Sequence, residues 1–199
     1  MNWYEEEVAE LIRRRDALPY QPQTIFYGSS TIRMWESLYE DFKDCQPVNL
    51  GFGGSTLAAC VWFFERIVAP IKSAQNMFVY AGDNDLGDGR KPEEVFIFFE
   101  ELVNKMNQYY PGIPWYYISI KPSISRWNID DKIKYANKLI EAKINTQDNI
   151  TFINIYDAML DENGYPNAAL FDEDGLHLNK EGYEVWKEAL GAFCLHTAK

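Results

Sequence analysis

Short, almost continuously apolar runs recur along this chain, and longer amphipathic stretches separate them. Because the runs are rich in β-branched and aromatic residues, they are typical of strands that are covered on both faces of a sheet. The runs predict five strands, over Thr24–Gly28, Pro47–Leu50, Asn76–Gly82, Pro114–Ile120 and Ile150–Ile155. The amphipathic stretches predict helices over Glu5–Leu18, Thr31–Tyr39, Thr56–Ile67, Lys91–Tyr109, Asp130–Asn145 and Lys180–Leu195.

Strands that alternate with helices indicate a parallel sheet with helices packed on its faces. We therefore predict an α/β fold, a three-layer α/β/α sandwich built around a five-stranded parallel sheet. A chain of 199 residues with 47% hydrophobic residues is most simply one domain, over residues 1–199. Ligands of such sheets bind beyond the carboxyl ends of the strands, so the reactive residues are expected just after the strands.

The charge and the cysteines restrict the partners and the compartment. A formal net charge of -11 disfavours a nucleic acid or an anionic membrane surface as a partner. No apolar run reaches the length of a membrane span, and the first residues lack the pattern of a signal peptide. Cys45, Cys60 and Cys194 are widely spaced and form no metal-ligand cluster, so we expect reduced thiols in a cytoplasmic protein.

The segment Asp174-Gly175-Leu176-His177 carries one of only two histidines in the chain. The other, His196, lies in the last few residues, where order is usually poor. Imidazole is the side chain best suited to take and return a proton near neutral pH. Asp174 lies three residues before His177 and can hold its ring in one tautomer, so this pair is the predicted acid–base group.

A nucleophile for such a base is predicted in the segment Gly28-Ser29-Ser30-Thr31, which runs from a strand into a helix. Taken alone, Ser29, Ser30 and Thr31 are ordinary helix caps. Ser30 is also placed as a nucleophile whose own backbone N–H could help to hold an oxyanion. Only the presence of the other catalytic parts favours the second interpretation.

Two further strand ends offer donors for an oxyanion. Gly51-Phe52-Gly53-Gly54-Ser55-Thr56 places three glycines before a helix, and the N–H of Gly54 could reach a developing negative charge. Ala81-Gly82-Asp83-Asn84 follows the third strand, and the Asn84 side chain supplies a neutral N–H donor. The alternatives are a tight turn at the glycines and an Asx-turn at Asn84.

Taken together and in this order, these blocks resemble those of the SGNH hydrolase superfamily, the GDSL-like lipases and acylhydrolases. The resemblance implies a flavodoxin-like strand order. It also implies a triad of Ser30, His177 and Asp174, with oxyanion donors from Ser30, Gly54 and Asn84. Ser29 stands where the family usually has Asp, a form that resembles the platelet-activating-factor acetylhydrolases and carbohydrate acetylesterases.

The resemblance implies a serine esterase that hydrolyses short-chain acyl esters and needs no cofactor or metal, with O-acetyl groups on carbohydrates as a preferred class. A lysophospholipase or thioesterase of the same superfamily stays open, as does a non-catalytic glycan- or flavin-binding module on the same fold. The run Asp83–Gly89 only faintly resembles a calcium loop, because Asp88 stands where glycine is required. A small-molecule ester, with a saccharide as its alcohol, is the expected partner, and a homo-oligomer stays open.

Two other features have a structural and a functional interpretation. Arg126 and Trp127 follow the fourth strand, so they are candidates for contacts with substrate, although a solvated charge and a packed indole fit as well. The aromatic residues Trp62, Phe63 and Phe64 in the predicted helix Thr56–Ile67 could build a dimer face. We expect them in the core, because aromatic clusters in such helices usually pack on the sheet.

Overall fold

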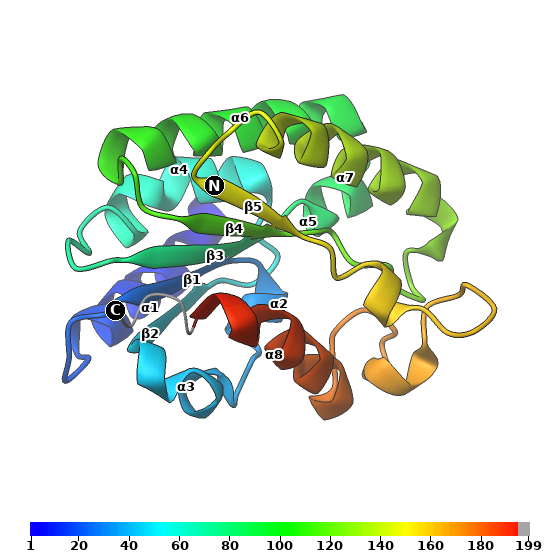
Figure 1. Ribbon diagram of the computed structural model, residues 1–199, viewed down its shortest axis with the longest axis horizontal. Coiled ribbons are helices and arrows are strands. Elements are labelled where there is room, and N and C mark those ends of the chain that lie inside the picture. Colours follow the sequence, from blue (N-terminus) through cyan, green and yellow to red (C-terminus); the bar gives the residue numbers. More distant parts are fainter. Residues whose placement is uncertain (195–199) are drawn as a thin grey trace.

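The computed structural model describes residues 1–194, and its centre is a five-stranded sheet in which all strands are parallel (Figure 1). The strands are β1 (Thr24–Gly28), β2 (Pro47–Gly51), β3 (Asn76–Tyr80), β4 (Trp115–Ile118) and β5 (Ile150–Ile153). Their spatial order is β2-β1-β3-β4-β5, the doubly wound order of flavodoxin-like folds. The predicted fold class and strand order are confirmed. Leu195 and His196 lie outside the described residues.

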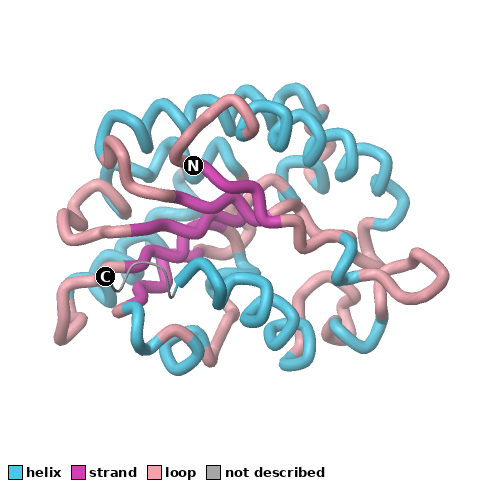
Figure 2. The backbone as a smooth tube through the Cα atoms, in the orientation of Figure 1, coloured by secondary structure: helices cyan, strands magenta, loops and turns pink. Residues whose placement is uncertain are grey.

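Helices cover both faces of the sheet and so form three layers (Figures 1 and 2). One face carries α1 (Glu5–Asp16), α4 (Leu57–Ile67), α6 (Pro92–Tyr109) and α7 (Asp130–Ile144). The other face carries α2 (Ser30–Arg33), α3 (Leu38–Asp41) and α8 (Lys180–Cys194). The short helix α5 (Asp83–Gly87) begins at the carboxyl end of β3. Single 3-10 turns lie at Asn2–Tyr4, Lys43–Cys45, Trp127–Ile129, Asp157–Met159 and Ala168–Leu170.

The strands explain why two separate cores form. Tyr27 points into the cluster beneath α4 and α6, whereas its neighbour Phe26 joins the cluster beneath α3 and α8. Residues alternate in this way because successive side chains of a strand point to opposite faces. In β1 and β3, which have helices on both faces, every residue is buried, which is why these strands read as almost unbroken apolar runs.

The predicted helix Thr31–Tyr39 is wrong as one element, because α2 and α3 are separated by a turn over Met34–Ser37. The turn directs Trp35 into the core, where its ring lies 5.2 Å from that of Tyr183. The indole N–H of Trp35 donates to Asp41 at 2.8 Å. A large buried aromatic residue thus interrupts a segment whose sequence pattern continues.

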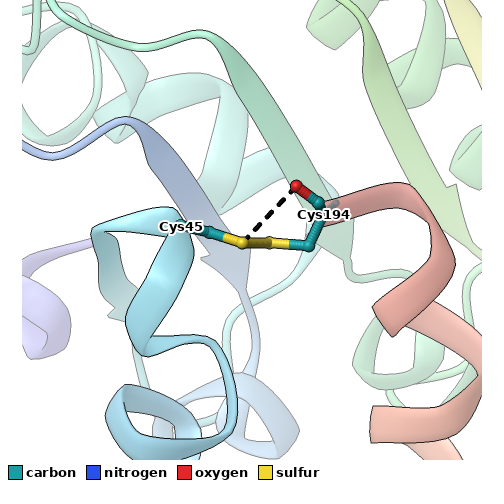
Figure 3. The surroundings of a disulfide bond; sticks show 2 residues. All are labelled: Cys45 and Cys194. Atoms are coloured by element: carbon teal, nitrogen blue, oxygen red, sulfur yellow. Dashed lines mark hydrogen bonds between the residues drawn. A yellow bond between two sulfur atoms is a disulfide. The ribbon is translucent and has the colours of Figure 1, made fainter. Parts of the chain in front are cut away.

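The prediction for the cysteines is wrong for two of the three. Cys45 and Cys194 form a disulfide between the turn after α3 and the last residue of α8, with their Cα atoms 6.3 Å apart (Figure 3). The Cys45 sulfur also lies 3.5 Å from the Cys194 carbonyl oxygen. Cys60 is free and buried. Disulfides persist mainly in oxidising compartments, so the cysteines give no support to a cytoplasmic location.

The prediction for the aromatic residues of α4 is confirmed in part. Phe63 and Phe64 are completely buried, but the Trp62 side chain is 66% exposed. Three consecutive residues of a helix span about 200° around its axis, so they cannot all face the sheet.

Within residues 1–194, every helix is too short or too polar to span a lipid bilayer.

Candidate active site

Ser30 lies where β1 ends and α2 begins, at the carboxyl edge of the sheet. The chain turns sharply there because Gly28 adopts a φ of +141°. A Cβ on Gly28 would lie 1.8 Å from the carbonyl oxygen of Tyr80, so only glycine can occupy this position. The N–H of Ser29 donates to the same Tyr80 carbonyl at 2.9 Å, which fixes the turn against β3. Ser30 is therefore presented at the edge of the sheet, half-buried, by a rigid turn.

The structure brings His177 and Asp174 to Ser30 from a segment almost 150 residues away. The Nε2 atom of His177 lies 3.0 Å from the hydroxyl oxygen of Ser30. The Nδ1 atom of His177 lies 2.5 Å from Oδ2 of Asp174. With its proton on Nδ1, the imidazole can accept the hydroxyl proton of Ser30 at Nε2.

Asp174 also organises the loop that carries His177. Its Oδ1 atom accepts the backbone N–H groups of Leu176 at 2.8 Å and of His177 at 2.9 Å. Partial desolvation raises the pKa of Asp174, but the hydrogen bond from the His177 ring and those from the two N–H groups outweigh it and lower the pKa to about 2. Asp174 is thus ionised at neutral pH and can hold a positive charge that forms on His177.

The Gly54 loop lies beside the Ser30 turn. The Gly28 carbonyl oxygen accepts both the Phe52 N–H at 3.0 Å and the Ser55 hydroxyl at 2.9 Å, so the loop is tied to the end of β1. Gly54 has a φ of +63° and is exposed, and a Cβ there would meet no atom within 4 Å. The Tyr4 hydroxyl donates to the Gly54 carbonyl at 2.9 Å, a contact that no sequence pattern indicates.

Asn84 lies in the first turn of α5 and faces the same loop. Its Nδ2 atom donates to the carbonyl oxygen of Ser55 at 3.0 Å. Asp85, which follows Asn84 in the helix, accepts a hydrogen bond from the backbone N–H of Leu57, the first residue of α4, at 2.7 Å. Complete burial of the Asp85 side chain raises its pKa to about 6. These bonds hold α5 against the residues at which α4 begins, and they tie Asn84 to the residue that follows Gly54.

Arg126 and Trp127 occupy different surroundings. Nη2 of Arg126 donates to Oδ1 of Asn84 at 3.0 Å, and Nη1 forms an ion pair of 2.6 Å with Asp83. Trp127 is half-buried, and its ring lies 5.5 Å from the ring of Tyr165. Tyr165 is 57% exposed. Arg126 therefore contacts Asn84 and Asp83 at the beginning of α5, while Trp127 lies in an aromatic pair.

Lys121 is a residue of this region that the sequence analysis did not single out. Its side chain is completely buried, and burial lowers the pKa of its ammonium group. Nζ of Lys121 donates to the Leu176 carbonyl at 2.7 Å and lies 3.8 Å from Asp83. A buried lysine beside a carboxylate could be suspected only once the fold had placed its loop against the His177 loop.

Within the described part of the chain, no three His, Cys, Asp or Glu side chains gather in a way that could hold a metal ion.

A serine, a histidine and an aspartate in hydrogen-bond contact beside a doubly wound α/β sheet are the arrangement of the serine hydrolases, and the contacts at Ser30 resemble those of that class. Comparison with family models identifies the particular family: the GDSL-like Lipase/Acylhydrolase family matches residues 21–185. The chain belongs to this family, and it is a carboxylic ester hydrolase. Comparison with curated proteins gives no match.

Solved structures share this fold. A proposed platelet activating factor from Streptococcus pneumoniae has a TM-score of 0.87 at 20% identity, covering 97% of this chain and 95% of its own. A GDSL-like lipase from Bacteroides thetaiotaomicron has a TM-score of 0.76 at 22% identity, covering 98% and 97%. A carbohydrate esterase family 3 protein from Talaromyces cellulolyticus has a TM-score of 0.69 at 16% identity, covering 88% and 97%. At these identities the likeness concerns the fold alone.

Proposed function

We propose that this protein is a serine esterase in which Ser30 is the nucleophile, His177 the general base and acid, and Asp174 the group that orients His177. The observation that carries the proposal is the unbroken contact from the Ser30 hydroxyl through the imidazole to the Asp174 carboxylate, at 3.0 and 2.5 Å. Both distances allow hydrogen bonds of the kind that activates a serine.

In the proposed reaction His177 takes the hydroxyl proton as Ser30 attacks the ester carbonyl, and the carbonyl oxygen becomes an oxyanion. The backbone N–H groups of Ser30 and Gly54 and the Asn84 amide donate to this oxygen. His177 then gives its proton to the departing alcohol, which leaves an acyl group on Ser30. A water molecule, deprotonated by His177, attacks this acyl group, and His177 returns the proton to the Ser30 oxygen as the acid leaves.

We propose short acyl esters as substrates, with an O-acetyl group on a carbohydrate as the preferred class. Two solved structures with this fold are described as a carbohydrate esterase family 3 protein and as an acetyl esterase. Asp174 and His177 are 50% and 23% exposed at their side chains, which leaves room for a bulky polar alcohol. Trp127 and the exposed ring of Tyr165 offer an aromatic face of the kind on which sugars stack.

The proposed partner is accordingly a small ester, with no nucleic acid or membrane. The location in the cytoplasm stays a prediction, and the disulfide between Cys45 and Cys194 counts against it.

The first test is the intact mass of the protein after treatment with a small fluorophosphonate. We expect one adduct on the wild type and none on Ser30→Ala. Ser29→Ala is the matched control, because Ser29 is adjacent but buried, and we expect it to keep the adduct. An unlabelled, folded wild type would refute the proposal and favour a glycan- or flavin-binding module.

The second test addresses the substrate. We expect turnover of p-nitrophenyl esters to fall steeply from acetate to octanoate, and acetylated xylo-oligosaccharides to release acetate. Trp127→Ala should raise KM for the saccharide severalfold and leave KM for p-nitrophenyl acetate unchanged, because we propose that the longer saccharide, and not the small aryl ester, stacks on the aromatic pair. Preference for octanoate or for a lysophospholipid or thioester would replace this substrate class by the alternatives within the family.

A further inference from the structure

The side-chain amide of Asn84 is held in one orientation by two partners of opposite kind. Oδ1 faces the guanidinium of Arg126 at 3.0 Å, and a guanidinium can only donate. Nδ2 faces the carbonyl oxygen of Ser55 at 3.0 Å, and a carbonyl oxygen can only accept. Rotating the amide by 180° would oppose donor to donor and acceptor to acceptor. One proton of Nδ2 is bonded to Ser55, and the second is left for another acceptor.

We propose that Arg126 is a positioning residue of the reaction, which locks and polarises the Asn84 amide so that its free N–H can stabilise the oxyanion. The inference rests on the proposed function and deepens it. A hydrogen bond from a cation to Oδ1 draws electron density away from Nδ2, which makes the Nδ2–H a stronger donor. Arg126 thereby acts through Asn84 and needs no contact with the substrate.

The charges around Arg126 support this role. Asp83 is 4% exposed and is the carboxylate shared by the two cations, Arg126 at 2.6 Å and Lys121 at 3.8 Å. Because the side chains of Arg126 and Asp83 are largely buried, the charge of the guanidinium acts on the Asn84 amide with little screening by water. Lys121 extends this group of charges to the Leu176 carbonyl, in the loop of His177.

Gly87, in the same helix as Asn84, leaves space for the guanidinium of Arg126 because it has no side chain. A Cβ on Gly87 would lie 2.7 Å from both Cζ and Nε of Arg126. The φ of Gly87 is not positive, so an alanine there is compatible with the backbone and favours the helix. Gly87→Ala should therefore displace Arg126 without weakening α5, which gives a test that does not remove any polar group.

The experiment is a double-mutant cycle on short-ester turnover with Arg126→Met, Asn84→Ala and the combined variant, each checked for folding by circular dichroism. We expect Arg126→Met to lower kcat about 10- to 100-fold, the range for one hydrogen bond to a charged group, with KM almost unchanged. In the Asn84→Ala background the same substitution should cost less than about threefold, because its target is gone. Gly87→Ala should lower kcat in the same direction.

Two further variants separate positioning from a general effect of charge. Arg90 forms an ion pair with Asp85 of the same helix at 3.3 Å, and within residues 1–194 it makes no side-chain hydrogen bond to Asn84, so Arg90→Met should leave kcat unchanged. Arg126→Lys should restore only part of the activity, because one ammonium group cannot reach both Asp83 and Asn84 as the planar guanidinium does. A short alkylboronic acid, whose tetrahedral adduct on Ser30 is an anion with an oxygen in the place of the oxyanion, should bind Arg126→Met more weakly by about the factor lost in kcat.

Equal losses from Arg126→Met with and without Asn84 would overturn the inference while leaving the serine esterase intact. Unchanged boronate affinity in a variant of reduced kcat would do the same. If the wild type shows no adduct on Ser30 and no turnover, both the proposed function and the inference fall. If Arg126→Met does not fold, Gly87→Ala and Arg126→Lys replace it in the cycle with Asn84→Ala, because neither variant leaves Asp83 without a basic side chain nearby.

Discussion

Asp174→Asn is the most informative change at the proposed triad, because the structure determines which way the new amide must turn. Oδ1 of Asp174 accepts two backbone N–H groups, at 2.8 and 2.9 Å, so the amide oxygen of asparagine has to take that place. Its NH2 group then faces Nδ1 of His177, where Oδ2 lies at 2.5 Å in the native protein. Nδ1 must become an acceptor, which moves the ring proton to Nε2, opposite the Ser30 hydroxyl.

A histidine with its proton on Nε2 cannot accept the proton of Ser30. In other serine hydrolases the wrong tautomer lowers kcat about 10⁴-fold, which corresponds to about 5 kcal/mol of transition-state stabilisation. We expect a loss of this size here, since the loop bonds to Leu176 and His177 remain and the geometry is otherwise kept. Both serine labelling and ester turnover should fall together, because each needs the deprotonated hydroxyl.

The assay is kcat for p-nitrophenyl acetate between pH 6 and 8, alongside thermal unfolding to verify the fold. Asp172→Asn is the matched control, because Asp172 is an exposed carboxylate of the same loop, and its turnover should stay within about threefold of the wild type. A folded Asp174→Asn protein that keeps turnover within tenfold of the wild type would refute the reasoning, since the tautomer of His177 would then not depend on Asp174.

Three further results are expected. Asn84→Ala should lower ester turnover about 100- to 1000-fold while the fold stays intact, and unchanged turnover would remove Asn84 from the oxyanion site. Burial raises the pKa of Asp85 to about 6, so the folded state binds its proton more tightly than the unfolded state. Ionised Asp85 therefore destabilises the fold increasingly as pH rises from about 4 to 6. Over that window the free energy of unfolding of Asp85→Asn, measured in urea, should rise relative to that of the wild type by up to about 3 kcal/mol. A difference independent of pH would contradict this. Cys45→Ser should lower the free energy of unfolding by about 2–5 kcal/mol, because the disulfide closes a separation of 149 residues, and equal stability with and without a reductant in the wild type would contradict it.

The local pattern of apolar residues was sufficient to predict the central strands of the sheet. The apolar runs at Thr24–Gly28 and Asn76–Tyr80 are strands because burial on both faces demands apolar residues at every position. The same reasoning failed at Trp35, where a buried ring requires a turn inside an apparently continuous helix. It failed again at Trp62, because the side of α4 that is left uncovered depends on which helices pack beside it.

The candidate site divides in a similar way. Ser30, Gly54, Asn84 and the pair Asp174 and His177 were predicted because each block follows a strand or stands in a polar loop, and their order resembles that of a family. The family itself is now shown by the match over residues 21–185, while the roles of the individual residues stay proposals.

The periods of the elements, the glycine turn before Ser30 and the spacing of Asp174 and His177 follow from the amino-acid sequence, because each depends on neighbours in the chain. Three contacts become visible only in the folded chain: Arg126 donates to Asn84, Lys121 is buried against the Leu176 carbonyl, and Cys45 pairs with Cys194. These contacts join residues 42, 55 and 149 positions apart. No local pattern encodes them, since they arise where the ends of parallel strands and the helices beyond them meet at one edge of the sheet.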